Sequence, residues 1–215
     1  NTYGDSLAKM NDVGTISFVL DEKLRSISTI VDGDSIIMNG ADQNFSYNYS
    51  FSDSNDNGRI LLSMVALDSA SNQADTIIDR IYFDKTAPQL SAIFEGSINE
   101  DKVYSKHGDS LQLSWQKVEL ESGLKRAYIG LGSDSGLVDV VNWTMASRDD
   151  ESSLTSINLQ NNSKYYGSIY LEDNVGNISD SLWGNGITID LLPPVVGDVW
   201  DGFLDEDIDY TADST

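Results

Sequence analysis

Short runs in which apolar and polar residues alternate recur along the whole chain. In the clearest run, aromatic residues at positions 45, 47, 49 and 51 alternate with serine and asparagine. Because successive side chains of a strand point to opposite faces, this period of two predicts a β-strand with one buried face. The same reasoning predicts strands at 15–20, 35–38, 60–67, 76–83, 110–115, 125–131, 154–159, 165–171 and 186–189. Clusters of Gly, Asn, Asp and Ser separate the runs, and no helical stripe of about ten residues is found, so the chain is predicted to be all-β.

The chain contains an internal repeat. Residues 84–88 read DKTAP and residues 190–194 read DLLPP, so an Asp and a final Pro return at an offset of 190 − 84 = 106 residues. Upstream, LDSASN at 67–72 is matched by EDNVGN at 172–177, with an offset of 173 − 68 = 105 residues. Because self-similarity at a fixed period is the signature of repeated structural units, we predict a tandem array.

The repeat continues beyond its second copy. FEG at 94–96 returns as WDG at 200–202, again at an offset of 200 − 94 = 106 residues. We therefore predict two complete domains, 1–87 and 88–193, followed by the start of an incomplete third repeat at 194–215. About seven short strands per hundred residues are typical of a β-sandwich, so we expect each complete domain to be one.

Two local patterns resemble known families of β-sandwich repeats. The LDSASN segment at 67–72, followed by DKTAP at 84–88, is similar to the closing hairpin and linker of bacterial Ig-like repeats. The second unit is similar to fibronectin type III domains, because Trp115 lies on an early strand and Tyr165 lies at the position of the tyrosine corner. Asn161 stands where that family has a proline, so the corner departs from the family pattern there.

The resemblance implies an architecture and a setting. It implies tandem Ig-like/fibronectin type III-like β-sandwiches. Large secreted or cell-surface proteins of bacteria and archaea carry such arrays, and they serve as adhesins, stalks, filaments or the spacers of secreted enzymes. The expected localisation is therefore extracellular or at the cell surface. The chain does not begin with Met, and we expect it to be a piece of a longer protein.

Charge narrows the range of partners. The chain has 35 Asp and Glu against 13 Lys and Arg, which gives a formal net charge of −22. Nucleic acid is excluded as a partner because phosphate binding requires clustered cations. No apolar run approaches the roughly 18 residues of a membrane helix, so no membrane insertion is expected. The absence of Cys excludes disulfides and thiolate metal sites. One explanation of the high acidic content is that a strongly negative surface keeps a protein soluble in salt water.

The sequence offers little support for catalysis. Its single histidine, His107, lies in a turn-like stretch before a predicted strand, and no Gly-x-Ser-x-Gly nucleophile motif is present. Paired carboxylates of the kind that glycosidases use arise by chance among 35 acidic residues. We therefore expect no enzymatic activity and name no catalytic residue.

The segment 53–58, DSNDNG, is the strongest candidate for a metal site. It supplies oxygen ligands at the first, third and fifth positions of an EF-hand-type loop, namely Asp53, Asn55 and Asn57, followed by Gly. The closing acid is missing because Met64 occupies its position, and the segment lies between two predicted strands instead of two helices. An ordinary polar turn between strands remains the alternative.

Topology adds further oxygen donors to this segment. In a seven-stranded sandwich the loop between the fifth and sixth strands lies at the pole where the chain leaves. The next domain presents its second-to-third and sixth-to-seventh loops to the same pole. Ca²⁺ takes about six to eight oxygen ligands, so the sequence predicts a Ca²⁺ site at the domain junction. Its candidate ligands are Asp53, Asn55, Asn57, Asp84, Glu119, Glu121, Asp173 and Asn177, and Asp190 is the linker ligand of a weaker second junction.

These features favour a non-catalytic spacer segment of an extracellular repeat protein, such as a stalk, an adhesin or a filament. Its partners are then neighbouring repeats of the same chain, but three alternatives stay open. Trp143, Trp183 and Trp200 are candidates for binding a glycan or a host or cell-surface protein, whereas Trp115 is expected in the core. Alternatively, the chain is an accessory spacer of a secreted hydrolase. It could also self-assemble by accepting a strand at an unpaired sheet edge, with 195–215 as the candidate donor.

Overall fold

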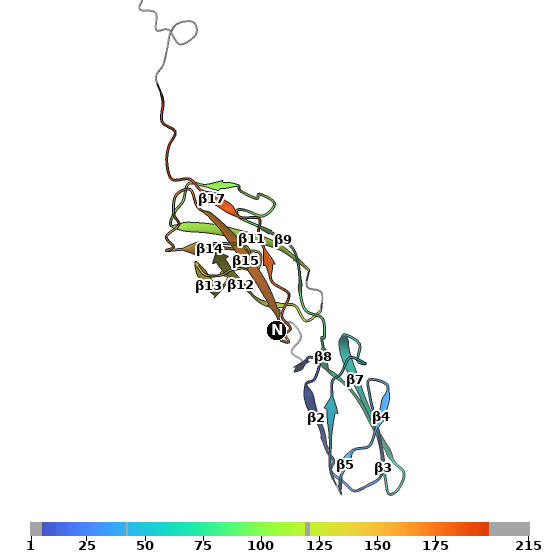
Figure 1. The fold of residues 1–215 in the computed structure, drawn as a ribbon. Helices are drawn as coiled ribbons and strands as arrows, with labels where there is room; N and C mark the ends of the chain where they lie inside the picture. The colour runs from blue at the N-terminus through green and yellow to red at the C-terminus, as the bar shows by residue number, and fades with distance from the viewer. Residues whose placement is uncertain (1–5, 42, 119–120, 198–215) are drawn as a thin grey trace, which may run out of the picture.

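The structure, a computed structural model, describes residues 6–41, 43–118 and 121–197. Two β-sandwiches follow one another along the chain, and Figure 1 shows them end to end. All described secondary structure is β, so the all-β fold class predicted from the alternating runs is confirmed. The described residues include no helix with the length and apolar character that crossing a membrane requires.

Eight described strands form the first sandwich. They are β1 (Ser6–Ala8), β2 (Val13–Val19), β3 (Leu24–Val31), β4 (Asp34–Ile36), β5 (Asn39–Ala41), β6 (Asn44–Ser50), β7 (Gly58–Asp68) and β8 (Gln73–Phe83). One sheet has the order β1-β8-β7-β3-β4 and the other has the order β2-β6-β5. β1 pairs with β8 in parallel, whereas β2 and β6 are antiparallel, with Val13 opposite Ser50 and Val19 opposite Asn44.

Nine described strands form the second sandwich. They are β9 (Gln89–Phe94), β10 (Tyr104–Ser105), β11 (Ser110–Val118), β12 (Leu124–Gly132), β13 (Val141–Met145), β14 (Glu151–Thr155), β15 (Lys164–Asp173), β16 (Leu182–Trp183) and β17 (Ile187–Ile189). One sheet has the order β10-β17-β15-β12-β13, with β16 also paired to β15, and the other has the order β14-β11-β9. β10 pairs in parallel with β17 as β1 does with β8, so the two sandwiches share this arrangement.

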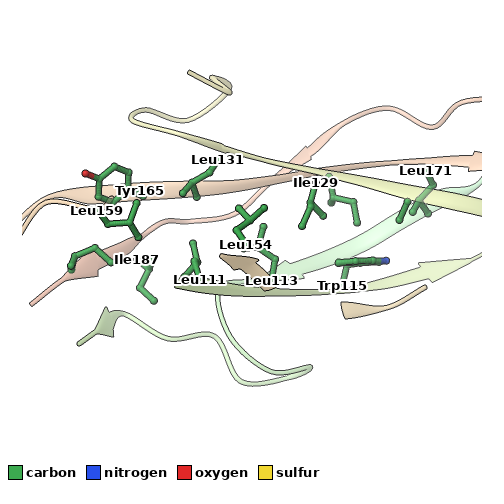
Figure 2. Close-up of a cluster of buried hydrophobic side chains, with 13 residues drawn as sticks. Leu111, Leu113, Trp115, Ile129, Leu131, Leu154, Leu159, Tyr165, Leu171 and Ile187 are labelled. Carbon is green, nitrogen blue, oxygen red and sulfur yellow. The ribbon is translucent and has the colours of Figure 1, made fainter. Parts of the chain in front are cut away.

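Each sandwich has its own core. In the second, Trp115, Leu113 and Leu171 are completely buried among side chains from both sheets (Figure 2). The expectation that Trp115 is a core residue is confirmed. In the first, Phe83 is completely buried, and the ring of Phe51 stacks on it at a centroid distance of 5.6 Å. Burial of these large apolar side chains is the main favourable contribution to folding of each unit.

The second sandwich has a tyrosine corner. Tyr165 is buried, and its hydroxyl oxygen accepts a hydrogen bond from the backbone N–H of Gln160 at 2.9 Å. The bond to upstream backbone that the fibronectin type III resemblance implies is therefore confirmed. It forms although Asn161 stands in place of the usual proline.

The observed strands depart from the predicted ones in two instructive places. The alternating pattern does not predict β3, because the polar Thr29 is buried and the apolar Ile30 is exposed, which interrupts the apolar–polar order of the sequence. The predicted strand at 154–159 has the wrong bounds, since β14 ends at Thr155 and Leu159 is a buried core residue of the following segment. A buried apolar residue outside a strand can therefore imitate a strand end in the sequence.

Candidate functional site at the domain junction

The junction between the sandwiches gathers loops from both of them. The chain leaves β8 at Phe83 and β9 begins at Gln89, so residues 84–88 form the linker. The first sandwich presents the loop 51–57, between β6 and β7, and the second presents the turn 173–177, which follows β15. Segments that are far apart in the sequence therefore surround one short linker (Figure 1).

Asp84, the first residue of the linker, is completely buried. Its Oδ1 accepts a hydrogen bond from the Thr86 N–H at 2.8 Å, and its Oδ2 accepts one from the Ser122 N–H at 3.0 Å. Its own N–H donates to the Ala8 carbonyl oxygen at 3.0 Å. Hydrogen bonds to a charged group are worth about 1.5–3 kcal/mol each, so this one residue joins the linker firmly to both sandwiches.

The turn after β15 is built around Asp173, which is also completely buried. Its Oδ1 accepts hydrogen bonds from the N–H groups of Val175 at 3.0 Å and Asn177 at 2.8 Å, and its Oδ2 accepts one from Asn177 Nδ2 at 2.8 Å. Gly176 has φ = 87°, a conformation that glycine adopts without strain. Burial, reinforced by the negative charge of Asp84, raises the pKa of Asp173 above its usual value.

The side chain of Asn177 connects this turn to the linker. Besides its bond to Asp173, Nδ2 donates to the carbonyl oxygen of Asp84 at 3.1 Å and lies 3.4 Å from that of Thr86. The bond from Ser122 to Asp84 is a second attachment of the linker to the second sandwich. We call Asp84, Ser122, Asp173 and Asn177 the junction clasp.

The first sandwich holds the linker from the other side, through the loop 51–57. Asn57 Oδ1 accepts a hydrogen bond from the Lys85 N–H at 2.8 Å, and Asn57 Nδ2 donates one to Thr86 Oγ1 at 2.6 Å. Lys85 Nζ donates to the Asp53 carbonyl oxygen at 2.7 Å and lies 3.3 Å from its carboxylate, which belongs to a side chain that is 88% exposed. The linker is therefore bonded to both sandwiches.

Side-chain contacts outside the linker also join the two sandwiches in the described part of the chain. The Tyr82 hydroxyl donates to Glu121 Oε2 at 3.3 Å, and Lys9 Nζ donates to the Gly176 carbonyl oxygen at 3.0 Å. Each contact involves a charged group, Glu121 or Lys9, at a partly exposed position, where solvent screens the interaction. The two contacts therefore help to orient the sandwiches without dominating the free energy of the junction.

Most of the predicted metal ligands lie at the junction. Asn55 is instead turned into the first sandwich, where its Nδ2 donates to the Tyr49 hydroxyl at 2.5 Å. Asp190 is exposed, and its Oδ1 accepts the Leu192 N–H at 3.2 Å. Glu119 lies outside the described residues. The predicted ligands that line the junction are Asp53, Asn57, Asp84, Glu121, Asp173 and Asn177.

The two carboxylates of the junction clasp, Asp84 and Asp173, are held by hydrogen bonds. Within the part of the chain that the structure describes, no three His, Cys, Asp or Glu side chains are grouped so that they could hold a metal ion. The carboxylate oxygens of Asp84 and Asp173 accept hydrogen bonds from N–H groups. The Ca²⁺ site stays a prediction.

Sequence reasoning finds Asp84, Asp173 and Asn177 of the clasp and misses the donor Ser122. Asp84, Asp173 and Asn177 all lie in the segments that return at the repeat offset, and this is the signal that points to them. Ser122 contributes a backbone N–H, which nearly every residue type supplies, so no sequence pattern marks it. The sequence marks Lys85 only by its place as the second residue of the DKTAP segment.

The other candidate residues lie away from the junction. His107 is exposed, and its N–H donates to Ser105 Oγ at 3.1 Å. Trp143 packs edge-on against Tyr170 at a centroid distance of 4.9 Å. Trp183 is 40% exposed, and Trp200 lies outside the described residues.

A buried acid in the second sandwich is a further titratable group. Glu95 is completely buried, and its Oε1 accepts hydrogen bonds from the N–H groups of Gly167 at 3.0 Å and Gly186 at 3.3 Å. Its Oε2 has no hydrogen-bond partner in the described structure. Burial, together with the charge of Asp101, raises the pKa of Glu95 to about 7. This carboxyl group therefore changes its charge near neutral pH.

Comparison with known proteins bears on the fold. No family model matches the chain, and no curated protein does. A structure of tandem titin domains matches over 87% of this chain, with a TM-score of 0.56 and 14% sequence identity, and the chain spans 62% of its length. The chain consists of tandem Ig-like/fibronectin type III-like β-sandwiches. At this level of identity the similarity shows the fold, as the resemblance in the sequence implied.

Two further structures match the chain with lower TM-scores. Fibronectin(III)-like modules of CbhA from Clostridium thermocellum match over 87% of this chain and 90% of theirs, with a TM-score of 0.38 and 10% identity. A 1.5-MDa bacterial ice-binding adhesin matches over 86% of this chain and 61% of the adhesin chain, with a TM-score of 0.46 and 14% identity.

Proposed function

We propose that the chain is a non-catalytic spacer segment of an extracellular repeat protein, in which each junction fixes the orientation of consecutive sandwiches. The observation that carries this proposal is the junction clasp. The buried Asp84 carboxylate accepts the Ser122 N–H, and Asn177 donates to the Asp84 carbonyl oxygen. Separation of the sandwiches would break both bonds, so the docked orientation is favoured over a flexible hinge.

The linker itself supports a stiff connection. It has five residues, 84–88, and it ends in Pro88, whose ring fixes φ. Its residues are bonded to the loop of Asn57 on one side and to Asn177 on the other. In a linear array each repeat contacts mainly its neighbours and adds length, which suits a stalk, an adhesin shaft or a filament. The net charge of −22 favours solubility of such a surface-exposed rod.

Calcium at the junction is a second proposal. The charge of Asp84 contributes to the raised pKa of Asp173, so the two carboxylates repel one another. A divalent cation held by their oxygens and those of Glu121 would relieve that repulsion. The hydrogen bonds of the clasp do not require the ion, and this makes the two proposals separable.

Small-angle scattering and thermal unfolding, with Ca²⁺ and then with excess EDTA, test both proposals. If the clasp alone holds the junction, the maximum dimension and the Tm stay the same after chelation. A broader distance distribution and a lower Tm in EDTA would show that the ion is required. A broad distribution under both conditions would contradict the spacer proposal.

Binding of a glycan or a cell-surface protein is a second candidate function. Tyr128 stacks on Tyr170 at a centroid distance of 4.7 Å, and Trp143 packs edge-on against the same ring. All three side chains are partly exposed and offer ring surface to a ligand. Binding to a glycan panel that Trp143→Ala abolishes without lowering the Tm would favour this candidate.

An accessory spacer of a secreted hydrolase would use the same junctions. The sequence that flanks the chain in its parent protein separates this role from a stalk. Further Asp-x-x-x-Pro segments at intervals of about 106 residues would indicate a stalk, and a catalytic motif would indicate a hydrolase.

A further inference from the structure

A groove with a volume of about 720 Å³ lies beside the domain junction. One of its walls is the linker together with the start of β9, residues 85–90, and another is the segment 178–182 of the second sandwich. Asp53 and Met10 of the first sandwich also line it. None of the four residues of the junction clasp lines the groove, so it is a separate feature of the junction.

Apolar side chains line the groove on both walls. Leu90 and Leu182 are partly buried and pack against the core of the second sandwich. Ile178 and Met10 are 61% and 44% exposed. An apolar side chain that entered the groove would contact the margin of the core and remove these exposed side chains from water, which is favourable.

Both walls also present backbone groups without partners. Ala87 precedes Pro88 and is therefore restricted to an extended conformation. Ala87 and Ser181 are partly buried, and their N–H groups form no hydrogen bond with another described residue. Because a backbone N–H that is withdrawn from water needs an acceptor, the two walls are ready to donate hydrogen bonds to a ligand.

The strands beside the groove leave room for such a ligand. β9 pairs with β11 in one sheet, and β16 pairs with β15 in the other. β9 and β16 lie near each other, but they are not paired with each other. A strand edge of this kind accepts an extended peptide, whose main chain supplies the missing hydrogen-bond partners.

The charges of the groove are mostly negative. The carboxylate of Asp180 is exposed and forms no hydrogen bond or ion pair with a described residue. The Asp53 side chain is 88% exposed, and its carboxylate lies 3.3 Å from Lys85 Nζ. In a chain with a net charge of −22, this lining attracts a basic segment and repels an acidic one.

An extended peptide fits these features better than a sugar does. Its carbonyl oxygens accept hydrogen bonds from the walls, while successive side chains point alternately into the groove and away from it. A sugar ring is commonly bound by stacking on an aromatic ring, and no aromatic residue is among those that line the groove. The lining therefore favours a polypeptide as the ligand.

We propose that this junction groove binds an extended segment of a partner protein in which apolar residues alternate with Lys or Arg. The apolar side chains contact Leu90 and Ile178, the basic side chains lie near Asp180, and the peptide carbonyl oxygens accept the N–H groups of Ala87 and Ser181. Because the walls come from the linker and from both sandwiches, the bound segment spans the junction. The inference adds recognition to the spacer role and rests on the proposed function only for the docked orientation.

Fluorescence anisotropy with a designed peptide tests the chemistry of the ligand. The probe is a short fluorescein-labelled peptide in which valine and lysine alternate, added to the full chain. We expect it to bind at least about tenfold more tightly than a peptide in which valine and glutamate alternate. The valine–lysine peptide with prolines at its centre should not bind, because proline removes backbone donors. Equal binding of the lysine and glutamate peptides would overturn the inference.

Variants of the full chain locate the binding. Asp180→Asn should weaken binding of the lysine peptide, and it should leave a peptide of alternating valine and serine unaffected. Asp150→Asn is the matched control, because Asp150 is exposed and does not line the groove. Equal weakening by the two variants would show that the peptide responds to net charge alone, and it would overturn the assignment to the groove.

Hydrogen exchange of single amides tests the docking directly. We expect the lysine peptide to slow exchange of the Ala87 and Ser181 amides by about tenfold or more and to leave the exposed Gly136 amide unchanged. Slow exchange of both amides in the chain alone would show that another segment of the chain fills the groove. Slowing that increases with protein concentration would show that a second copy fills it. Either result would overturn the inference.

Failure of this inference is distinct from failure of the spacer proposal. A narrow distance distribution in the scattering experiment above, together with no binding of the peptide, would overturn this inference and leave the spacer proposal standing. A broad distribution without binding would contradict both, because the groove forms only between docked sandwiches.

Discussion

Ser122 donates its backbone N–H to the Asp84 carboxylate across the domain junction, at 3.0 Å. Both residues are buried, and they lie 38 positions apart in the sequence. A buried carboxylate is tolerated when it has hydrogen-bond partners. The bond therefore gives the buried Asp84 Oδ2 a hydrogen-bond partner when the second sandwich is docked.

Replacing Asp84 by Ala should destabilise the docked state. The Ser122 N–H would stay buried without its acceptor, which costs about 1–3 kcal/mol. Chemical denaturation should show an earlier midpoint than in the parent chain. Asp190→Ala is the matched control, because Asp190 begins the corresponding linker and is exposed. An equal loss of stability in the two variants would show that the junction is not the source of the earlier midpoint.

The stability of the second sandwich should fall as the pH rises toward neutrality. The pKa of Glu95 is raised from its ordinary value of 4.5 to about 7. The folded state therefore binds this proton more tightly than the unfolded state does. Its contribution is complete below the unfolded pKa and is lost as the pH rises through about 7, with a total of about 3 kcal/mol.

Glu95→Gln isolates this group. Glutamine keeps an oxygen that can accept the Gly167 and Gly186 N–H groups and has no charge to bury. Thermal unfolding measured from about pH 4 to pH 8 should therefore give a flatter profile than in the parent chain. Glu100→Gln, at an exposed position nearby, should leave the profile unchanged. A Glu95→Gln profile as steep as that of the parent would refute the assignment.

Tyr165→Phe should destabilise the second sandwich by about 1–2 kcal/mol. The Gln160 N–H loses the hydroxyl that accepts its hydrogen bond, while the aromatic ring remains in the core. Tyr166→Phe is the control, because the neighbouring side chain is partly exposed and points away from the core. Urea denaturation of both variants should show a larger loss of unfolding free energy in Tyr165→Phe than in Tyr166→Phe.

The architecture of this chain could be predicted from its sequence because it depends on patterns that repeat. Alternation marks most of the strands, and the offset between Asp84 and Asp190 marks the units. β3 escapes the pattern because the polar Thr29 is buried and the apolar Ile30 is exposed, so the apolar–polar alternation is interrupted there. The predicted strand at 154–159 extends too far because Leu159 is buried in the core although it lies outside a strand.

The chemistry of the junction could be predicted only in part. Asp84, Asp173 and Asn177 are marked by the repeat as junction residues, and the structure places them together. Whether a carboxylate oxygen accepts an N–H or binds an ion depends on the groups that surround it in the fold. At Asp84 that group is the backbone of Ser122, which carries no signal in the sequence.

Distances between spin labels on the two sandwiches test most directly whether the junction clasp fixes their orientation. The chain has no Cys, so Ile37→Cys and Ser135→Cys introduce labels at exposed positions without competing thiols. We expect a narrow distance distribution in this labelled chain and also with Asn72→Ala, which weakens the matching turn away from the junction. Asn177→Ala removes the bond to Asp84 and should broaden the distribution. A distribution that stays narrow in Asn177→Ala, or one that is already broad before substitution, would contradict the account.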